Sequence, residues 1–141
     1  MSALPLTATS GRSSISIEDF ENGSIDPEQF DHEAHVFIAW SYLQKYDLED
    51  AIAKFSEALR SLTRKLGIES KYHETITWFF LILIAESKDK PGSNDWQTFK
   101  RQNPDLLTAR PSVIRKYYSD ERLDSSIARS QFVLPDKLPQ L

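Results

Sequence analysis

The 141-residue chain contains no cysteine. This absence excludes disulfide frameworks, thiolate metal sites and cysteine nucleophiles, and it makes a reducing compartment the simplest home for the protein. Glycine is also scarce. The four glycines are too far apart to form a phosphate-binding loop, and no serine lies in a Gly-x-Ser-x-Gly elbow. The sequence therefore lacks the signatures of phosphate loops, of serine-hydrolase elbows and of cysteine chemistry.

Long apolar runs and a basic surface are missing as well. The longest apolar run, residues 76–85, has ten residues including one threonine, Thr77, whereas a membrane-spanning helix needs about 20. No basic segment followed by an apolar one opens the chain, so we expect no secretory signal. Residues 1–30 hold one base and five acids, and residues 31–141 carry 16 of each sign. Because nucleic acids and anionic membranes attract basic surfaces, we expect neither partner and a cytoplasmic protein.

Composition divides the chain into an arm and one domain. Residues 1–25 are rich in serine, threonine and acids and have few apolar side chains, so we expect a disordered arm. Residues 26–137 are expected to form a single helical domain. Asp26 followed by Pro27 is typical of a helix start, and Asp31 is the alternative start.

Three longer helices are predicted from apolar side chains that recur every three or four residues. The first covers residues 27–46. The second begins after an Asp47 cap and ends before Gly67, and the third covers residues 71–88 behind a Ser70 cap. Because the third helix is apolar nearly all round, we expect it to be surrounded by the others.

Shorter helices are predicted near residues 96–99, 111–118 and 124–129, and no segment alternates as a half-buried strand does. The predicted fold class is therefore all-α, a small bundle of about five helices. Its predicted core includes Trp40, Phe55, Trp78, Phe80, Leu81 and Ile84.

The first two helices resemble a single tetratricopeptide-like (TPR-like) helix pair over residues 35–66. The small and aromatic residues at the spacings of that repeat are Ala39, Tyr42, Ala51, Phe55 and Ala58. The resemblance implies two antiparallel helices and a third that starts near the start of the first. One alternative function follows, a protein–protein interaction module without catalysis, with exposed aromatic side chains such as Phe37 or Tyr46 as its anchors.

All three histidines fall in two short segments. His32 and His35 are spaced i, i+3 and so share one side of a helix, and the repeat geometry places His73 at the same end of the bundle. Three neutral imidazoles with a carboxylate would suit a divalent transition metal such as iron, zinc or copper. His73, in the first turn of its helix, is expected to have a pKa lowered by the helix dipole, which keeps the ring neutral.

The same segments also fit a pocket for a small polar ligand. Asp31, Glu33 and Glu74 offer carboxylates near the imidazoles, and Tyr72 and Glu74 are the candidate acid/base or supporting groups. A purely structural role for the histidines is the third interpretation. The spacing alone leaves the metal site, the ligand pocket and the structural role open.

Several motifs together resemble a family of small bacterial proteins with no assigned reaction, over residues 30–137. They are Phe30-x-His32-x-x-His35-x-x-x-Ala39-Trp40-x-Tyr42-Leu43, Tyr72-His73-Glu74-Thr75-Ile76-Thr77-Trp78, Asn103-Pro104-Asp105-Leu106-Leu107, Tyr117-Tyr118-Ser119 and Ala128-Arg129-x-x-Phe132-Val133-x-Pro135-Asp136. The resemblance implies a bacterial, cytoplasmic protein. It directs attention to His32, His35, Tyr72, His73 and Glu74 and implies no particular activity.

Overall fold

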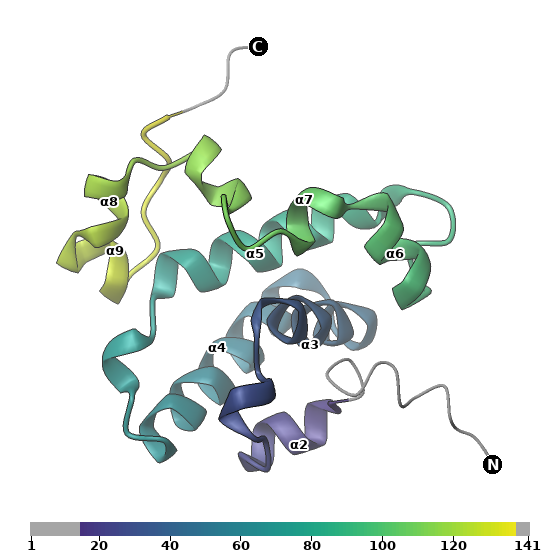
Figure 1. Ribbon diagram of the computed structural model, residues 1–141, viewed down its shortest axis with the longest axis horizontal. Coiled ribbons are helices and arrows are strands. Elements are labelled where there is room, and N and C mark those ends of the chain that lie inside the picture. The colour runs from purple at the N-terminus through teal and green to yellow at the C-terminus, as the bar shows by residue number, and fades with distance from the viewer. Residues whose placement is uncertain (1–14, 138–141) are drawn as a thin grey trace.

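The computed structural model describes residues 15–137, and within this range the chain is helical without strands (Figure 1). The predicted all-α class is confirmed. The described range contains eight α-helices rather than about five, because the last third of the chain folds as several short helices. The α-helices are α2 (Ile17–Asn22), α3 (His32–Lys45), α4 (Leu48–Lys65), α5 (Glu74–Glu86), α6 (Trp96–Gln102), α7 (Pro104–Leu107), α8 (Asp120–Asp124) and α9 (Ser126–Ser130). The 3-10 helices are η2 (Pro27–Gln29), η3 (Glu69–Lys71), η4 (Ser87–Asp89) and η5 (Val113–Lys116).

Aspartate caps start the two helices of the first pair. Asp31 precedes α3 and Asp47 precedes α4, and each carboxylate accepts a hydrogen bond from the backbone N–H three residues further on, at 3.0 and 2.9 Å. Asp26 instead caps the short η2. The cap predicted at Asp26 is thus present with Pro27 at the first helical position, but it starts this short turn, and the long helix starts at the alternative, Asp31. Gly67, just beyond α4, has φ of 72°, the left-handed conformation expected where glycine ends a helix.

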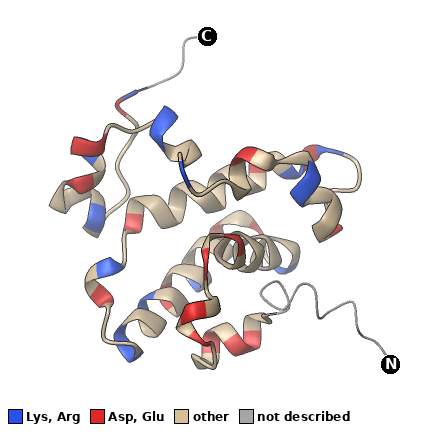
Figure 2. Cartoon of the chain, in the orientation of Figure 1, with Lys and Arg blue, Asp and Glu red and all other residues tan. Residues whose placement is uncertain are grey.

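The central helix α5 begins three residues later than predicted. The Ser70 cap is wrong, because residues 69–71 form η3 and the next two residues are extended. His73 caps α5 instead, with its Nδ1 accepting from the backbone N–H of Ile76 at 3.2 Å. Figure 1 shows α5 running between the α3–α4 pair and the C-terminal helices α8 and α9. This position explains the apolar surface on nearly all sides of α5, whose middle carries no charged side chain (Figure 2). No helix in residues 15–137 combines the length and the apolar character that crossing a bilayer requires.

The main core lies where α2, α3, α4, α5 and α6 meet. Of the predicted core residues, Trp40, Phe55, Leu81 and Ile84 are buried. Trp78 and Phe80 are only partly buried. Trp78 lies outside the main core, because it faces the C-terminal segment and stacks on Phe132 at 5.4 Å between ring centroids.

The predicted disordered arm is wrong for residues 15–25, which fold onto the α3–α4 pair. Ser16 caps α2, and Phe20 on α2 is fully buried. The ring of Phe20 stacks on Phe55 at 5.2 Å, and Tyr42 donates a hydrogen bond to Glu21 at 2.8 Å. The remaining part of the predicted arm, residues 1–14, lies outside the described residues. The helical domain therefore includes eleven residues of the predicted arm, whose buried Phe20 and partly buried Ile15, Ile17 and Ile25 pack against the main core.

The C-terminal segment builds a second, smaller core on the far side of α5. Its buried members are Phe79, Ile114, Tyr118, Ala128 and Val133. Thr75 of α5 is fully buried, donates to the carbonyl oxygens of Ala128 and Gln131, and accepts from the N–H of Val133. These bonds tie the last described residues to the start of α5, the same end of α5 at which His73 lies.

Candidate functional site

A cavity of about 580 Å³ lies between α3, α4 and α5. This volume falls within the range of small-molecule pockets, which is roughly 300–1,000 Å³. Most of its wall is apolar, and each helix contributes to it. The apolar lining includes Val36 and Ala39 of α3, Phe55, Leu59 and Leu62 of α4, and Ile76, Phe80 and Ile84 of α5. The polar lining consists of His32, His35, Thr63, Lys71, Tyr72, His73 and Thr77.

The structure brings all three histidines to the wall of this cavity. His32, at the start of α3, donates from Nε2 to the carbonyl oxygen of Leu106 at 2.8 Å. Its ring meets the ring of Phe80 edge-on, with the centroids 5.6 Å apart. His32 therefore joins α3 to α7 and α5. Its other ring nitrogen, Nδ1, forms no hydrogen bond with residues 15–137.

His73 uses both of its ring nitrogens. Nε2 donates to the carbonyl oxygen of Leu123 at 2.7 Å, and Nδ1 accepts from Ile76 at the start of α5. These two bonds fix the neutral tautomer with the proton on Nε2. Burial lowers the pKa of His73, although its hydrogen bond to Leu123 acts in the opposite direction. The predicted lowering is thus correct in direction, with desolvation rather than the helix dipole as its main cause.

His35 has no hydrogen bond from either ring nitrogen to any residue in the described range. Its ring lies on the ring of Phe30 with 4.0 Å between centroids, and part of its surface faces the cavity. Burial lowers the pKa of His35 to about 4, with a further lowering by His32 and a smaller opposing effect of Asp31. His35 is therefore a neutral imidazole at pH 7, and neither of its ring nitrogens has a hydrogen-bond partner among residues 15–137.

The three histidines do not form the predicted metal site. No group of three or more His, Asp or Glu side chains among residues 15–137 is arranged to hold an ion. His73 would have to give up a hydrogen bond to act as a ligand, because both of its nitrogens are engaged. The expected carboxylates are also engaged elsewhere: Asp31 caps α3, and Glu33 pairs with Lys100 at 3.1 Å. The arrangement favours a ligand pocket over a shared metal ion.

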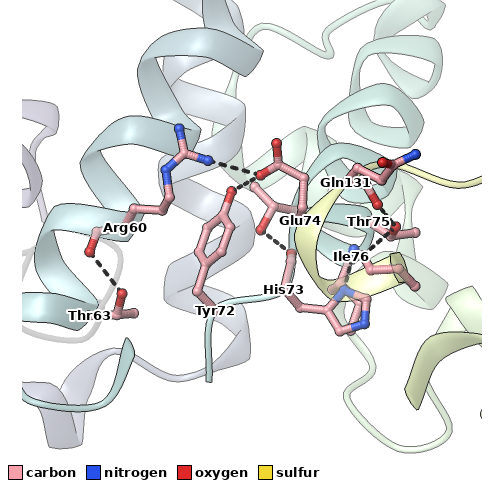
Figure 3. Close-up of polar contacts among 10 residues, drawn as sticks. Arg60, Thr63, Tyr72, His73, Glu74, Thr75, Ile76 and Gln131 are labelled. Carbon is pink, nitrogen blue, oxygen red and sulfur yellow. Dashed lines mark hydrogen bonds and ion pairs between the residues drawn. The ribbon is translucent and has the colours of Figure 1, made fainter. Parts of the chain in front are cut away.

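Tyr72 and Glu74, the predicted acid/base pair, contact each other beside the cavity (Figure 3). Tyr72 donates its hydroxyl proton to Oε1 of Glu74, and Arg60 of α4 reaches the same oxygen at 3.1 Å. The Arg60 guanidinium also lies over the Tyr72 ring, 5.4 Å from its centroid. Burial, reinforced by the bond to Glu74, raises the pKa of Tyr72 to about 12. These contacts favour a supporting role, in which the pair fixes the turn before α5 against α4.

His73 and Glu74 point in different directions (Figure 3). His73 lines the cavity, whereas Glu74 is turned toward Arg60 and does not line it. Arg60 was missed as a partner of Glu74, because nothing in the sequence relates two residues on different helices that are both charged and partly exposed.

Three polar lining residues were also missed. Thr63 donates to the carbonyl oxygen of Arg60 at 2.9 Å, and Thr77 donates to that of His73 at 2.8 Å, so both hydroxyls are paired. Lys71 is exposed and forms no hydrogen bond or ion pair through its side chain with the described residues. The helical periodicity marks α4 as amphipathic, but only the packed structure reveals that part of its apolar face borders an open volume.

Within residues 15–137, neighbouring helices cover much of the α3–α4 pair outside the cavity. Helix α5 packs against both of its helices, and α2 covers α4 and part of α3. Phe37 packs against Trp96 of α6 at 5.0 Å, and Tyr46 lies beside Tyr42 with two lysines near its ring. The large hydrophobic residues exposed in the described range, Ile127 and Leu134, lie outside this pair.

No model of a known protein family matches the chain, and neither a curated protein nor a solved structure does so. The resemblances to a bacterial family and to a TPR-like pair therefore stay predictions. The functional argument depends on the cavity and on the side chains that line it.

Proposed function

We propose that the protein binds a small, mainly apolar molecule in the cavity between α3, α4 and α5, and that a polar group of this molecule hydrogen bonds to His35. The observation that carries the proposal is the His35 ring, which faces a cavity of about 580 Å³ without a hydrogen-bond partner among residues 15–137.

A polar group that loses its contact with water without gaining a partner costs about 1–3 kcal/mol. In the described lining, both threonine hydroxyls, the Tyr72 hydroxyl, both nitrogens of His73 and Nε2 of His32 already have partners. Neither ring nitrogen of His35 has one among residues 15–137. His35 therefore marks the place where a ligand's polar group would be recognised. A neutral imidazole donates from one nitrogen and accepts at the other, so hydroxyl, carbonyl and carboxyl groups all suit it.

The proposal concerns binding. Catalysis by Tyr72 and Glu74 would require either group to leave the other and turn to the ligand. A divalent metal is the less favoured occupant, since His73 has no free nitrogen to offer. A bacterial origin and a cytoplasmic location remain part of the same proposal, and they are supported by the sequence motifs and by the absence of cysteine.

Two buried alanines provide a matched test of the cavity. Ala39 lines it, whereas Ala51 is equally buried and does not. Ala39→Leu is expected to fill part of the cavity, to change the free energy of unfolding by less than about 1 kcal/mol, and to weaken binding of the probe molecule octanol about tenfold. Ala51→Leu is expected to overpack the core, at a cost of about 2 kcal/mol, and to leave octanol binding unchanged. Urea denaturation and isothermal titration calorimetry measure the two effects.

Comparing the two substitutions shows whether the space beside Ala39 is open or is packed like an ordinary core. If Ala39→Leu destabilised the protein as much as Ala51→Leu, the cavity would not exist in solution. If the unaltered protein took up no octanol, the proposed binding function would be wrong.

A further inference from the structure

The charge of the cavity lining has one sign. Its described side chains include no aspartate or glutamate, whereas four of them carry nitrogen: Lys71 and the three histidines. The turn between α4 and α5 contains charges of both signs (Figure 2), but Glu69 of that turn is not part of the lining. A cationic ligand would lose its hydration in this cavity without gaining a carboxylate partner, which is costly.

Lys71 is the one lysine or arginine among the described residues of the lining. It lies on η3, at the rim, and no ion pair or hydrogen bond to a described residue engages its ammonium group. His35, on α3, adds a hydrogen-bond donor to the same lining. An uncompensated cation together with an unpaired N–H favours an anionic group over a neutral one of equal size.

We infer that the occupant is an amphipathic carboxylic acid, whose hydrocarbon body lies between α3, α4 and α5 while its carboxylate accepts a hydrogen bond from His35 and is attracted by Lys71. This inference rests on the proposed function, because it names the class of molecule that the cavity takes. The apolar contacts of Ala39, Phe55 and Ile84 hold the body, and the two nitrogen-bearing side chains select the head group.

Three probes that share the same hydrocarbon tail and differ only in the head group measure how much the head group contributes to binding. Octanoate, octanol and octylamine are titrated into the full chain at neutral pH by isothermal titration calorimetry. Octanoate is expected to bind most tightly and octylamine most weakly, about tenfold apart. Lys71→Gln is expected to weaken octanoate binding about threefold, as for a partly exposed ion pair, and to leave octanol binding unchanged.

Lys54→Gln is the matched control, because it removes the same charge from an exposed position on α4 outside the lining. Lys54→Gln is expected to change neither the octanoate affinity nor the octanol affinity. Octanol binding as tight as octanoate binding would overturn the carboxylic-acid inference and leave the binding function intact. An octanoate affinity that Lys71→Gln does not change would also overturn it, and a failure of all three probes to bind would reject the proposed function itself.

Discussion

Replacing Phe20 by alanine is expected to lower the free energy of unfolding by about 4 kcal/mol, the size seen for a fully buried phenylalanine. Phe20 is 0% exposed and its ring contacts three others, those of Phe55 at 5.2 Å, Phe30 at 5.6 Å and Tyr42 at 6.0 Å. The substitution removes these contacts and leaves a void under α2. Urea denaturation followed by circular dichroism measures the change.

Glu18→Ala on the same helix is the control for this prediction. Glu18 is exposed, so its removal is expected to change the free energy of unfolding by less than about 0.5 kcal/mol. A loss below about 1 kcal/mol for Phe20→Ala would mean that residues 17–22 do not belong to the folded domain.

Acid is expected to destabilise the protein through His35. Folding lowers the pKa of this ring from its ordinary value of 6.5 to about 4, so the unfolded chain binds a proton that the folded one rejects. The stabilising contribution of the neutral ring is complete above pH 6.5 and is lost as the pH falls to about 4. The corresponding loss is about 3 kcal/mol.

His35→Gln replaces the ring by a group that cannot gain a charge, so this part of the pH dependence is expected to disappear. His32→Gln is the control, because it leaves His35 in place and should keep most of the loss. His32 and the cap residue Asp31 act electrostatically on His35, and the other titratable groups of the described cavity lining are Lys71, Tyr72 and His73. Parallel stability curves for the unaltered protein and His35→Gln between pH 7 and pH 4 would contradict this account.

Local signals were sufficient to predict the longer helices. The Asp47 cap and Gly67 act through their own backbone neighbours, and both were placed correctly from the sequence. The start of α5 was misplaced because Ser70 and His73 are both able to cap a helix. The structure selects His73, whose second nitrogen bonds Leu123, 50 residues further along the chain.

The folding of residues 15–25 was not predicted, because the prediction of a disordered arm rested on the overall composition of residues 1–25. Serine, threonine and acids dominate the first 25 residues, but Phe20 of this segment is fully buried against Phe55 and Tyr42. The partly buried Ile15, Ile17 and Ile25 pack against the same core. The packing position that Phe20 occupies exists only in the folded α3–α4 pair, so the sequence alone does not reveal it.

The candidate site was predictable in part. The histidine spacing and the order of the helices were enough to place His32, His35 and His73 around one volume. Their hydrogen bonds were not predictable, because the partner of His32 lies 74 residues away and belongs to α7. The cavity itself depends on how Ala39 and Phe55 pack across α3 and α4, a property of the tertiary structure that no local pattern encodes.

The most direct test of the account is a titration of the protein, containing isotope-labelled histidine, with octanol, followed by NMR signals of the three imidazole rings. The account predicts that the His35 ring signals shift as the cavity fills, while His73 keeps the tautomer with its proton on Nε2. If all three rings kept their signals at saturating octanol, or if His73 responded while His35 did not, the proposed binding site would be contradicted.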